Sequence, residues 1–335
     1  MRSRARIPLE GVARVATSVA TSLADRRKFM VRVPENPPQG CPVSLFAASR
    51  YNPWASRSVV QIHSPRLKGR CDVPGDPDTP APLSWGAAPA LPLLPAGETH
   101  LFAFPLDPAP PRVAALERLL SRDERDRAGR FHQERDRRRY VVGRGQLRII
   151  LGRVLNGDAR ALAFRSGPHG KPALQGSEAH ARLRFNLSRS HELGLLAIQW
   201  DEEVGVDVEH VRPFPDALDI AKRFFAPEEY EALRALPTTE LDAGFVSYWT
   251  RKEAVVKSLG LGLAHPMGAF VLARSTTAAG ERVVIRDAGE TRSRWVVPLP
   301  APARDYVAAV ATARPPGPLR CWTWSDNPAL GQGRT

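Results

Sequence analysis

The stretch Leu183–Glu209, LRFNLSRSHELGLLAIQWDEEVGVDVE, contains the strand pattern that decides the fold. Residues 183–187 and 193–200 form short apolar runs, which are typical of buried strands. The acidic residues 201–203 favour a turn, and 204–211 then follows with the pattern of another strand. Successive strands with short connections predict an antiparallel sheet.

The segments around this stretch alternate between helical and extended patterns. Residues 137–156 carry apolar residues at helical spacing and end near an Asn-Gly pair, a common helix stop. We expect further helices at 112–131, 216–235 and 239–260, and strands at 268–274, 281–286, 293–299 and 305–313. Helices beside an antiparallel sheet indicate an α+β fold.

Residues 1–96 differ in composition and in apolar patterning from the rest of the chain. Fourteen of the 32 prolines fall there, and proline removes a backbone donor that a helix or sheet needs. Dense proline without an apolar period predicts a disordered arm. The alternative that stays open is that translation begins further downstream and part of this region is an extension outside the true protein.

Composition restricts the class of protein and its partners. The 335 residues are 43% hydrophobic and hold no apolar run of membrane-spanning length, so we expect no membrane segment. Cys41, Cys71 and Cys321 are too far apart for zinc-ligand spacing, which favours the reducing cytoplasm. The net charge of +13 and the pI of about 10.4 favour a polyanionic partner: nucleic acid, a phosphorylated cofactor or an acidic protein.

Two short patterns place carboxylates where chemistry is feasible. On a strand, Asp207 and Glu209 point to one face, where their mutual repulsion favours a hard cation such as Mg²⁺. On a helix over 249–257 (WTRKEAVVK), Glu253 shares a face with Lys252, and Lys257 lies one turn beyond. Taken alone, the first pattern is better explained by a solvated strand face and the second by a surface Glu–Lys pair.

A third pattern offers donors to phosphate oxygens. Phe185–His191 (FNLSRSH) carries Ser188 and Arg189 at a strand end, and Lys171 lies between a glycine and a proline on an expected turn. A loop with incidental polar residues is the alternative. His191 has neither a second histidine nor a cysteine at zinc-ligand spacing.

The order of the motifs distinguishes these alternatives. The chain reads GKP, FNLS, GVDVE, RFF followed by EEY, WTRKEAVVK, and then GLGL leading to Phe270. From about residue 121 to 313 it closely resembles the Sfp-type 4′-phosphopantetheinyl transferases. The resemblance implies a pseudo-dimer of two similar α/β halves, which we place at 97–202 and 203–325, with coenzyme A and Mg²⁺ in the cleft between them.

The resemblance also implies roles for single residues. Asp207, Glu209 and Glu253 match the metal ligands, and Glu253, or a water that it orients, matches the base that takes the acceptor proton. Lys257, and with less support Lys252, match groups that balance pyrophosphate charge.

Binding of the coenzyme A nucleotide is implied for a second set of residues. Lys171, Ser188 and Arg189 match contacts to the 3′-phosphate and adenine, and Arg127 matches a basic position that contacts the cofactor. The family commonly has histidine directly after the first serine of FN-apolar-SHS, whereas this chain has Arg189, which keeps a permanent charge. Glu229, Arg144 and Arg148 match less specific positions, where helix packing or core salt bridges are equally plausible.

The implied activity is transfer of the phosphopantetheine arm of coenzyme A to a serine of an apo acyl or peptidyl carrier protein, an acidic partner, by a monomeric cytoplasmic enzyme that needs Mg²⁺ and releases 3′,5′-ADP. A basic nucleic-acid-binding module is the main rival, yet the chain has no recognisable zinc-finger, RNA-recognition or helix-turn-helix signature. A non-catalytic member of the same fold is the other rival, against which the intact carboxylates and lysines argue. The pattern does not distinguish fatty-acid, polyketide and nonribosomal-peptide carriers.

Overall fold

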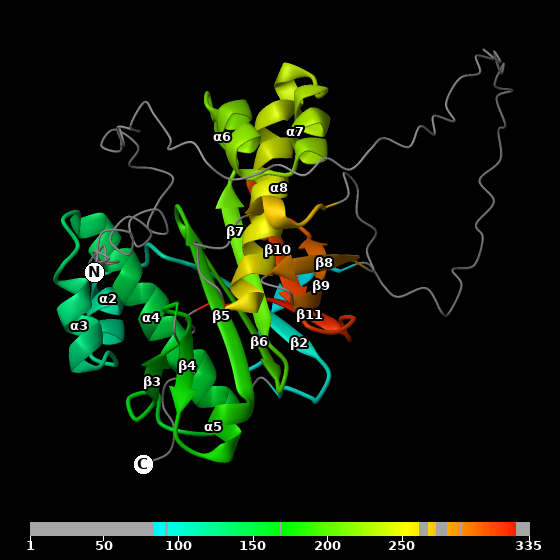
Figure 1. Cartoon of the computed structure of the whole chain (residues 1–335). Helices are drawn as coiled ribbons and strands as arrows, with labels where there is room; N and C mark the ends of the chain where they lie inside the picture. The colour runs from blue at the N-terminus through cyan, green and yellow to red at the C-terminus, as the bar shows by residue number, and fades with distance from the viewer. Residues whose placement is uncertain are drawn as a thin grey trace, which may run out of the picture. The chain divides into compact units, whose positions relative to one another are not determined.

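The computed structural model describes residues 83–90, 93–167, 169–260, 267–272, 280–287 and 290–325. Most of the expected N-terminal arm therefore lies outside the described residues. The residues that are described form two sheets, each with its own helices (Figure 1). Within this part of the chain, no helix has the length and apolar content needed to cross a bilayer.

The helices and strands follow one another in a mixed order along the chain (Figure 1). The helices are α2 (Pro110–Glu117), α3 (Arg122–Ala128), α4 (Glu134–Val154), α5 (Glu178–Arg182), α6 (Ala217–Phe224), α7 (Pro227–Arg234), α8 (Thr238–Leu259) and the 3₁₀ turn η2 (Met267–Ala269). The strands are β1 (Trp85–Ala87), β2 (Thr99–Pro105), β3 (Ala163–Ser166), β4 (Pro172–Gln175), β5 (Leu183–Ser190), β6 (Leu193–Trp200), β7 (Val204–His210), β8 (Glu281–Asp287), β9 (Glu290–Leu299), β10 (Tyr306–Thr312) and β11 (Leu319–Thr323).

The first sheet has the strand order β1-β11-β2-β6-β5. Strands β2, β6 and β5 are antiparallel neighbours, whereas β11 pairs in parallel with both β1 and β2. Strand β11 lies in the expected C-terminal half, and β1 lies in the expected arm, yet both belong to this first sheet. The proposed boundaries at 96 and 202 therefore divide the chain but do not separate the sheets.

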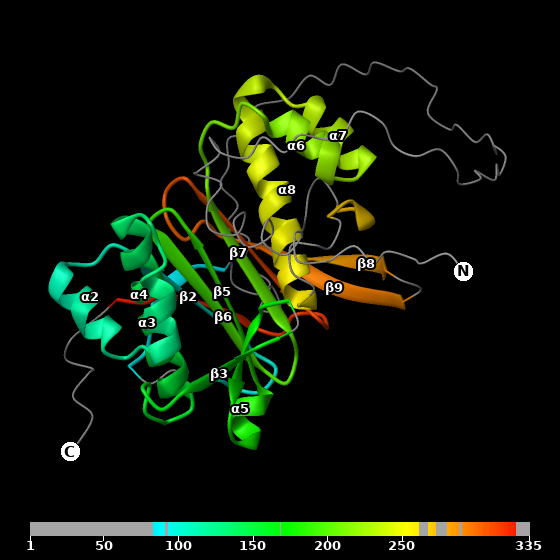
Figure 2. The ribbon, with the colours of Figure 1, turned by 60° about the vertical axis from the view of Figure 1, so that its left-hand side comes forward.

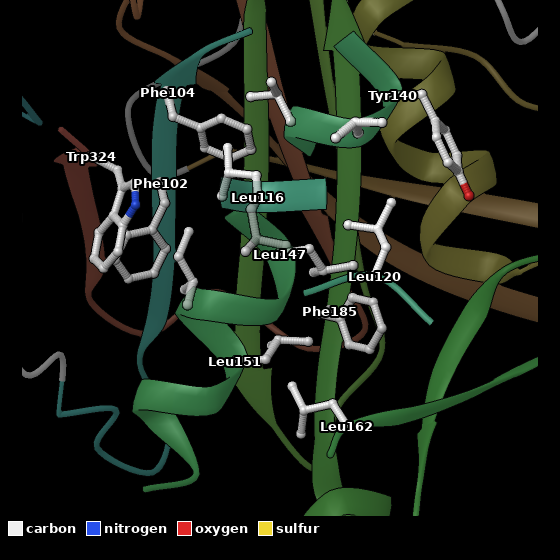
Figure 3. Close-up of a cluster of buried hydrophobic side chains, with 14 of the residues drawn as sticks. Phe102, Phe104, Leu116, Leu120, Tyr140, Leu147, Leu151, Leu162, Phe185 and Trp324 are labelled. Carbon is white, nitrogen blue, oxygen red and sulfur yellow. The ribbon is translucent and has the colours of Figure 1, made fainter. Parts of the chain in front are cut away.

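Helices α2, α3 and α4 cover one face of the first sheet (Figures 1 and 2). Apolar side chains of β2 and β5 meet those of the long helix α4, which places Phe102, Leu147, Leu151 and Phe185 in one buried cluster (Figure 3). Because burial of each such side chain contributes about 1.5–3 kcal/mol, this cluster fixes α4 against the sheet.

The second sheet is antiparallel with the order β7-β10-β9-β8, and helix α8 packs along it (Figure 2). The closest approach is at Gly205 of β7. A Cβ added there would overlap the carbonyl oxygen of Ala254 and the amide nitrogen of Ser258. The absent side chain therefore sets the distance between α8 and β7, and with it the position of every α8 side chain relative to the strand.

The two sheets meet where β5 and β7, each an edge strand of its own sheet, run side by side. No backbone ladder joins these strands in the sheets as they are described. Side chains bridge the gap instead: Asn186 Oδ1 accepts the amide of Val206 at 2.9 Å, and Ser190 Oγ accepts the amide of His210 at 3.1 Å. We refer to this junction of β5 and β7 as the seam.

The α+β class and the strands of 183–211 are confirmed, while three expected elements are wrong in detail. The helix expected at 112–131 is two helices, because Ser121 and Glu124 form a capping box that starts α3. The helix expected at 216–235 ends at Phe224 and restarts at Pro227, a favoured first helical residue. The described part of the strand expected at 268–274 is instead coil and the turn η2.

Replacing Gly205 by alanine should destabilise the protein, because the new methyl group has no space between β7 and α8. We expect a loss of about 1–3 kcal/mol or more in the free energy of unfolding, measured by urea denaturation. Gly129→Ala is the matched control, since the nearest atom to an added Cβ there is 3.6 Å away. Equal denaturation midpoints for the two variants would contradict the close packing at Gly205.

Candidate active site

Asp207 lies at the centre of a cluster built from three elements that meet at the seam. Its carboxylate, on β7, is 2% exposed. Oδ1 accepts a hydrogen bond from Ser188 Oγ of β5 at 2.7 Å and an ion pair from Lys257 Nζ of α8 at 2.5 Å. Lys257 Nζ also donates to Ser188 Oγ at 3.0 Å. The structure thus brings together three residues that are separated by up to 69 positions in the sequence.

Two further carboxylates lie close enough to Asp207 and Lys257 to influence their charges. Glu209, two residues along β7, accepts from Ser190 Oγ at 2.6 Å. Glu253, four residues before Lys257 on α8, is 5% exposed. Among the described residues, neither Glu253 Oε1 nor Asp207 Oδ2 has a hydrogen-bond donor, although both atoms are buried. A buried carboxylate oxygen without a donor is destabilising, so these atoms are open to an additional positive charge.

The pKa values of the cluster also show an excess of carboxyl groups over cations. Burial raises the pKa of Glu253 to about 7, against the lowering effect of Lys257, and Asp207 raises it further. Burial and the Asp207 carboxylate raise the pKa of Glu209 to about 8. Burial opposes the charge of Lys257, but Asp207 and Glu253 outweigh it and hold the pKa of the ammonium above its usual value. Three carboxyl groups therefore share one ammonium.

The residues of this cluster fit a hard divalent cation in their chemistry. Carboxylate oxygens are the ligands that Mg²⁺ prefers, and the two orphaned oxygens provide acceptor sites that the protein leaves unfilled. In the described ranges, no group of three or more His, Cys, Asp or Glu side chains is already arranged around a common point. The donor set is thus suitable, while the ligand geometry is not preformed.

A second, cationic group lies where β5 faces helices α3 and α4. The guanidinium of Arg189 is 5.4 Å from the ring centroid of Tyr140, and that of Arg127 is 5.8 Å from the same centroid. Gly143 leaves the space for Arg189, since an added Cβ would lie 2.8 Å from Arg189 Cδ. Both arginines are exposed, and within the described residues neither has a carboxylate partner. Two permanent charges without a protein anion make this group receptive to an anionic ligand.

Helix α3 is held in place by a network of salt bridges. The sequence did not decide whether its arginines belong to the core or to the cofactor site. Glu124 is buried and accepts from Arg144 and, at 2.7 Å, from Arg148 Nε. Arg148 also donates to the carbonyl groups of Ala159 and Leu162, both at 2.9 Å. These arginines are therefore core salt bridges, and they fix the helix that carries Arg127.

Lys171 and Lys252, both predicted to contact the cofactor, have partners within the protein. Lys171 Nζ binds Glu203 at 2.6 Å and the Val204 carbonyl at 2.9 Å, near the start of β7. Lys252 is fully buried; its ammonium pairs with Glu229 at 2.8 Å and donates to the carbonyl groups of Met267 and Phe270. All three protons of Lys252 are thus committed, so the structure does not bring it to the Asp207 cluster.

Two side chains at these sites carried no sequence prediction. Tyr140, which lies against both arginines, is an aromatic residue at helical spacing and has the pattern of a core position. Ser190, which binds Glu209, stood within a quoted motif without a role. The signal that could have found Ser190 is its spacing: Ser188 and Ser190 are two apart on β5, as Asp207 and Glu209 are on β7.

Neutralising Glu253 should stabilise the protein more at high pH than at low pH. A carboxyl group whose pKa is raised in the folded state favours folding when protonated, and that contribution is lost as pH rises from its unfolded value near 4.3 through about 7. The melting temperature of Glu253→Gln relative to the wild type should therefore increase by a few degrees between pH 5.5 and 8.5, without added divalent cations. Glu228→Gln, an exposed control, should show a pH-independent difference. A constant difference for Glu253→Gln would contradict the raised pKa.

Comparisons with known proteins agree with the two-part architecture. Residues 203–311 match the family model described as the 4′-phosphopantetheinyl transferase superfamily, and residues 107–200 match the model described as 4′-phosphopantetheinyl transferase, N-terminal. The chain is 37% identical to the 4′-phosphopantetheinyl transferase HetI of Nostoc sp. over 230 residues, which is 69% of this chain and 94% of HetI. It is 31% identical to the 4′-phosphopantetheinyl transferase Sfp of Bacillus subtilis over 153 residues, which is 45% of this chain and 65% of Sfp.

Among solved structures, holo-[acyl-carrier-protein] synthase of Thermotoga maritima matches 33% of this chain and 61% of its own, with 17% identity and a TM-score of 0.23. So limited a superposition carries no structural argument. The two family models together with the extent of the match to HetI show that this chain belongs to the 4′-phosphopantetheinyl transferase family.

Proposed function

We propose that the protein transfers the 4′-phosphopantetheine arm of coenzyme A to a serine hydroxyl of an apo acyl or peptidyl carrier protein and releases 3′,5′-ADP. The observation that carries the proposal is the cluster at the seam, where Asp207, Glu253 and Lys257 meet from two elements. The basic chain suits an acidic carrier, and we propose a monomer that acts in the cytoplasm.

Asp207, Glu209 and Glu253 are the residues that would hold Mg²⁺. When bound, the cation would neutralise charge on the pyrophosphate of coenzyme A as the leaving group departs. The support for this set is the chemistry of the ligands and the two buried oxygens that lack donors.

Glu253 is the group that we propose as the general base. In the cation-free site its pKa is about 7, because burial disfavours the ionised form, so this carboxylate accepts a proton near neutral pH far better than an ordinary glutamate. The acceptor hydroxyl loses its proton to Glu253 while its oxygen forms a bond to phosphorus. The bond between that phosphorus and the bridging oxygen breaks, and the electron pair leaves with 3′,5′-ADP. Lys257 is positioned to offset the charge that develops on the nucleotide.

The coenzyme A nucleotide is proposed to bind at the cationic group. Arg127 and Arg189 offer guanidinium donors that match a phosphate monoester, and both guanidinium groups lie over the ring of Tyr140. Arg189 directly follows Ser188 on β5, and Ser188 contacts Asp207. Lys171 would have to exchange Glu203 for phosphate, and Lys252 would have to break a buried pair, so their assignments have less support.

Loss of the central carboxylates should abolish transfer. The wild type, incubated with coenzyme A, Mg²⁺ and a panel of apo carrier proteins, should add one phosphopantetheine to at least one carrier, as read by intact mass. Asp207→Asn and Glu253→Gln should lower turnover by about 10²–10³-fold or more, because each removes charge stabilisation or the proton acceptor. Glu228→Gln, on the exposed face of α7, should behave as the wild type. Unchanged turnover in a folded variant would remove that residue from the site.

Arg189 should discriminate coenzyme A from its 3′-dephospho form. One hydrogen bond to a charged group contributes about 1.5–3 kcal/mol, so Arg189→Ala should raise the Michaelis constant for coenzyme A by about 10–100-fold. The constant for 3′-dephospho-coenzyme A should change little, and saturated turnover should change less than binding. Arg130→Ala, which removes another exposed arginine close to Arg127 in the sequence, is the control. Equal effects on the two cofactors would exclude the 3′-phosphate contact.

A further inference from the structure

Three polar side chains of β5 form a ladder along the seam. Asn186, Ser188 and Ser190 are two residues apart and therefore share one face of the strand. Their partners on β7 are the amide of Val206, the carboxylate of Asp207 and the carboxylate of Glu209. Each rung of the ladder joins the two sheets, but only the two serines also touch a carboxylate of the cluster.

The hydroxyl of Ser190 has its orientation fixed from two sides. The amide of His210 donates into Ser190 Oγ at 3.1 Å, while Ser190 Oγ lies 2.6 Å from Glu209 Oε2. A serine hydroxyl has one proton, and an ionised carboxylate only accepts, so that proton is directed to Glu209 whenever Glu209 is ionised, as a cation ligand has to be. The backbone of β7 thus uses Ser190 to set the position of a side chain on the same strand.

Glu209 depends on this contact more than Asp207 depends on Ser188. Asp207 is also bound by Lys257, whereas Ser190 is the one hydrogen-bond partner of Glu209 within the described residues. Glu209 is half-buried near the end of β7, and the carboxylate of Asp207 repels it. Without Ser190, the side chain is free to rotate away from Asp207 toward water.

We propose that Ser190 is a positioning residue, whose hydroxyl holds the Glu209 carboxylate beside Asp207 and thereby prepares the divalent-cation site. The inference rests on the proposed function, because it assumes that the cluster binds a cation together with coenzyme A. It adds a residue that touches neither the cation nor the substrate and acts through Glu209 alone.

The test measures cation binding directly. Mn²⁺ replaces Mg²⁺ as the probe, and free Mn²⁺ is quantified by electron paramagnetic resonance in the presence of protein and coenzyme A, with coenzyme A alone subtracted. Partners that orient a metal ligand typically contribute 10–100-fold to metal affinity, so Ser190→Ala should weaken Mn²⁺ binding by about tenfold. Ser190→Thr retains the hydroxyl and should recover most of the affinity.

Asn186→Ala is the matched control for the structural role of the ladder. It removes a rung between the same two strands without touching a carboxylate, so it should lower the melting temperature while Mn²⁺ affinity stays within about twofold. Ser166→Ala, on the exposed end of β3, controls for the loss of any hydroxyl. If Asn186→Ala does not fold, the contrast between Ser190→Ala and Ser190→Thr still separates hydroxyl loss from a change of side-chain volume.

The outcomes separate this inference from the proposed function. Mn²⁺ binding by Ser190→Ala within twofold of the wild type would overturn the positioning role, as would equal weakening in Asn186→Ala or no Mn²⁺ binding by the wild type. The transferase proposal is tested by a different measurement. It would be contradicted if the wild type modified no carrier in the intact-mass assay. If the wild type binds Mn²⁺ but transfers no phosphopantetheine, the effect of Ser190→Ala on Mn²⁺ affinity can still be measured.

Discussion

The structure depends on the way in which two sheet edges meet without sharing a backbone ladder. Strands β5 and β7 present unpaired edges to each other, and side chains rather than peptide groups bridge the gap. Such a junction leaves room for polar side chains that a continuous sheet would exclude, and it places them at the border of two hydrophobic cores. The cluster around Asp207 is therefore a consequence of the fold's division into two sheets, and the same hydrogen bonds that join the sheets orient the carboxylates.

Polar residues within one turn of helix α8 have different roles: some stabilise the fold, and others belong to the candidate active site. Lys252 and Glu253 are adjacent, yet Lys252 pairs with Glu229 and ties η2 to α7 and α8, while Glu253 lies at the seam. Because the helix is buried on nearly all sides over this stretch, both residues are shielded from water. The buried pair of Lys252 and Glu229 fixes the helix in a position from which Glu253 and Lys257 reach β7.

Much of this arrangement could be predicted from sequence, because the patterns are local or follow the family. The strands of 183–211, the shared face of Asp207 and Glu209 and the turn between Glu253 and Lys257 all follow from period-2 or period-3.6 spacing. The partner of Lys252 could not be predicted, since helical spacing does not tell which of two buried faces meets a carboxylate. Tyr140 escaped for a related reason: its contact with Arg189 is set by the approach of α4 to β5 across Gly143, a tertiary distance that no local pattern encodes.

Strand β11 has a consequence for how the chain reaches this structure. It lies between β1 and β2, so the apolar strand β2 has its partner on that side only once residues 319–323 are available. During synthesis on the ribosome, everything up to β10 emerges while the edge of β2 is still open, and an open apolar edge is a template for pairing with other chains. The long sequence separation of this contact also makes its formation slow. Pairing of β11, the last strand among the described residues, thus acts as the closing step of the first sheet, and until that step the nascent chain exposes the edge of β2.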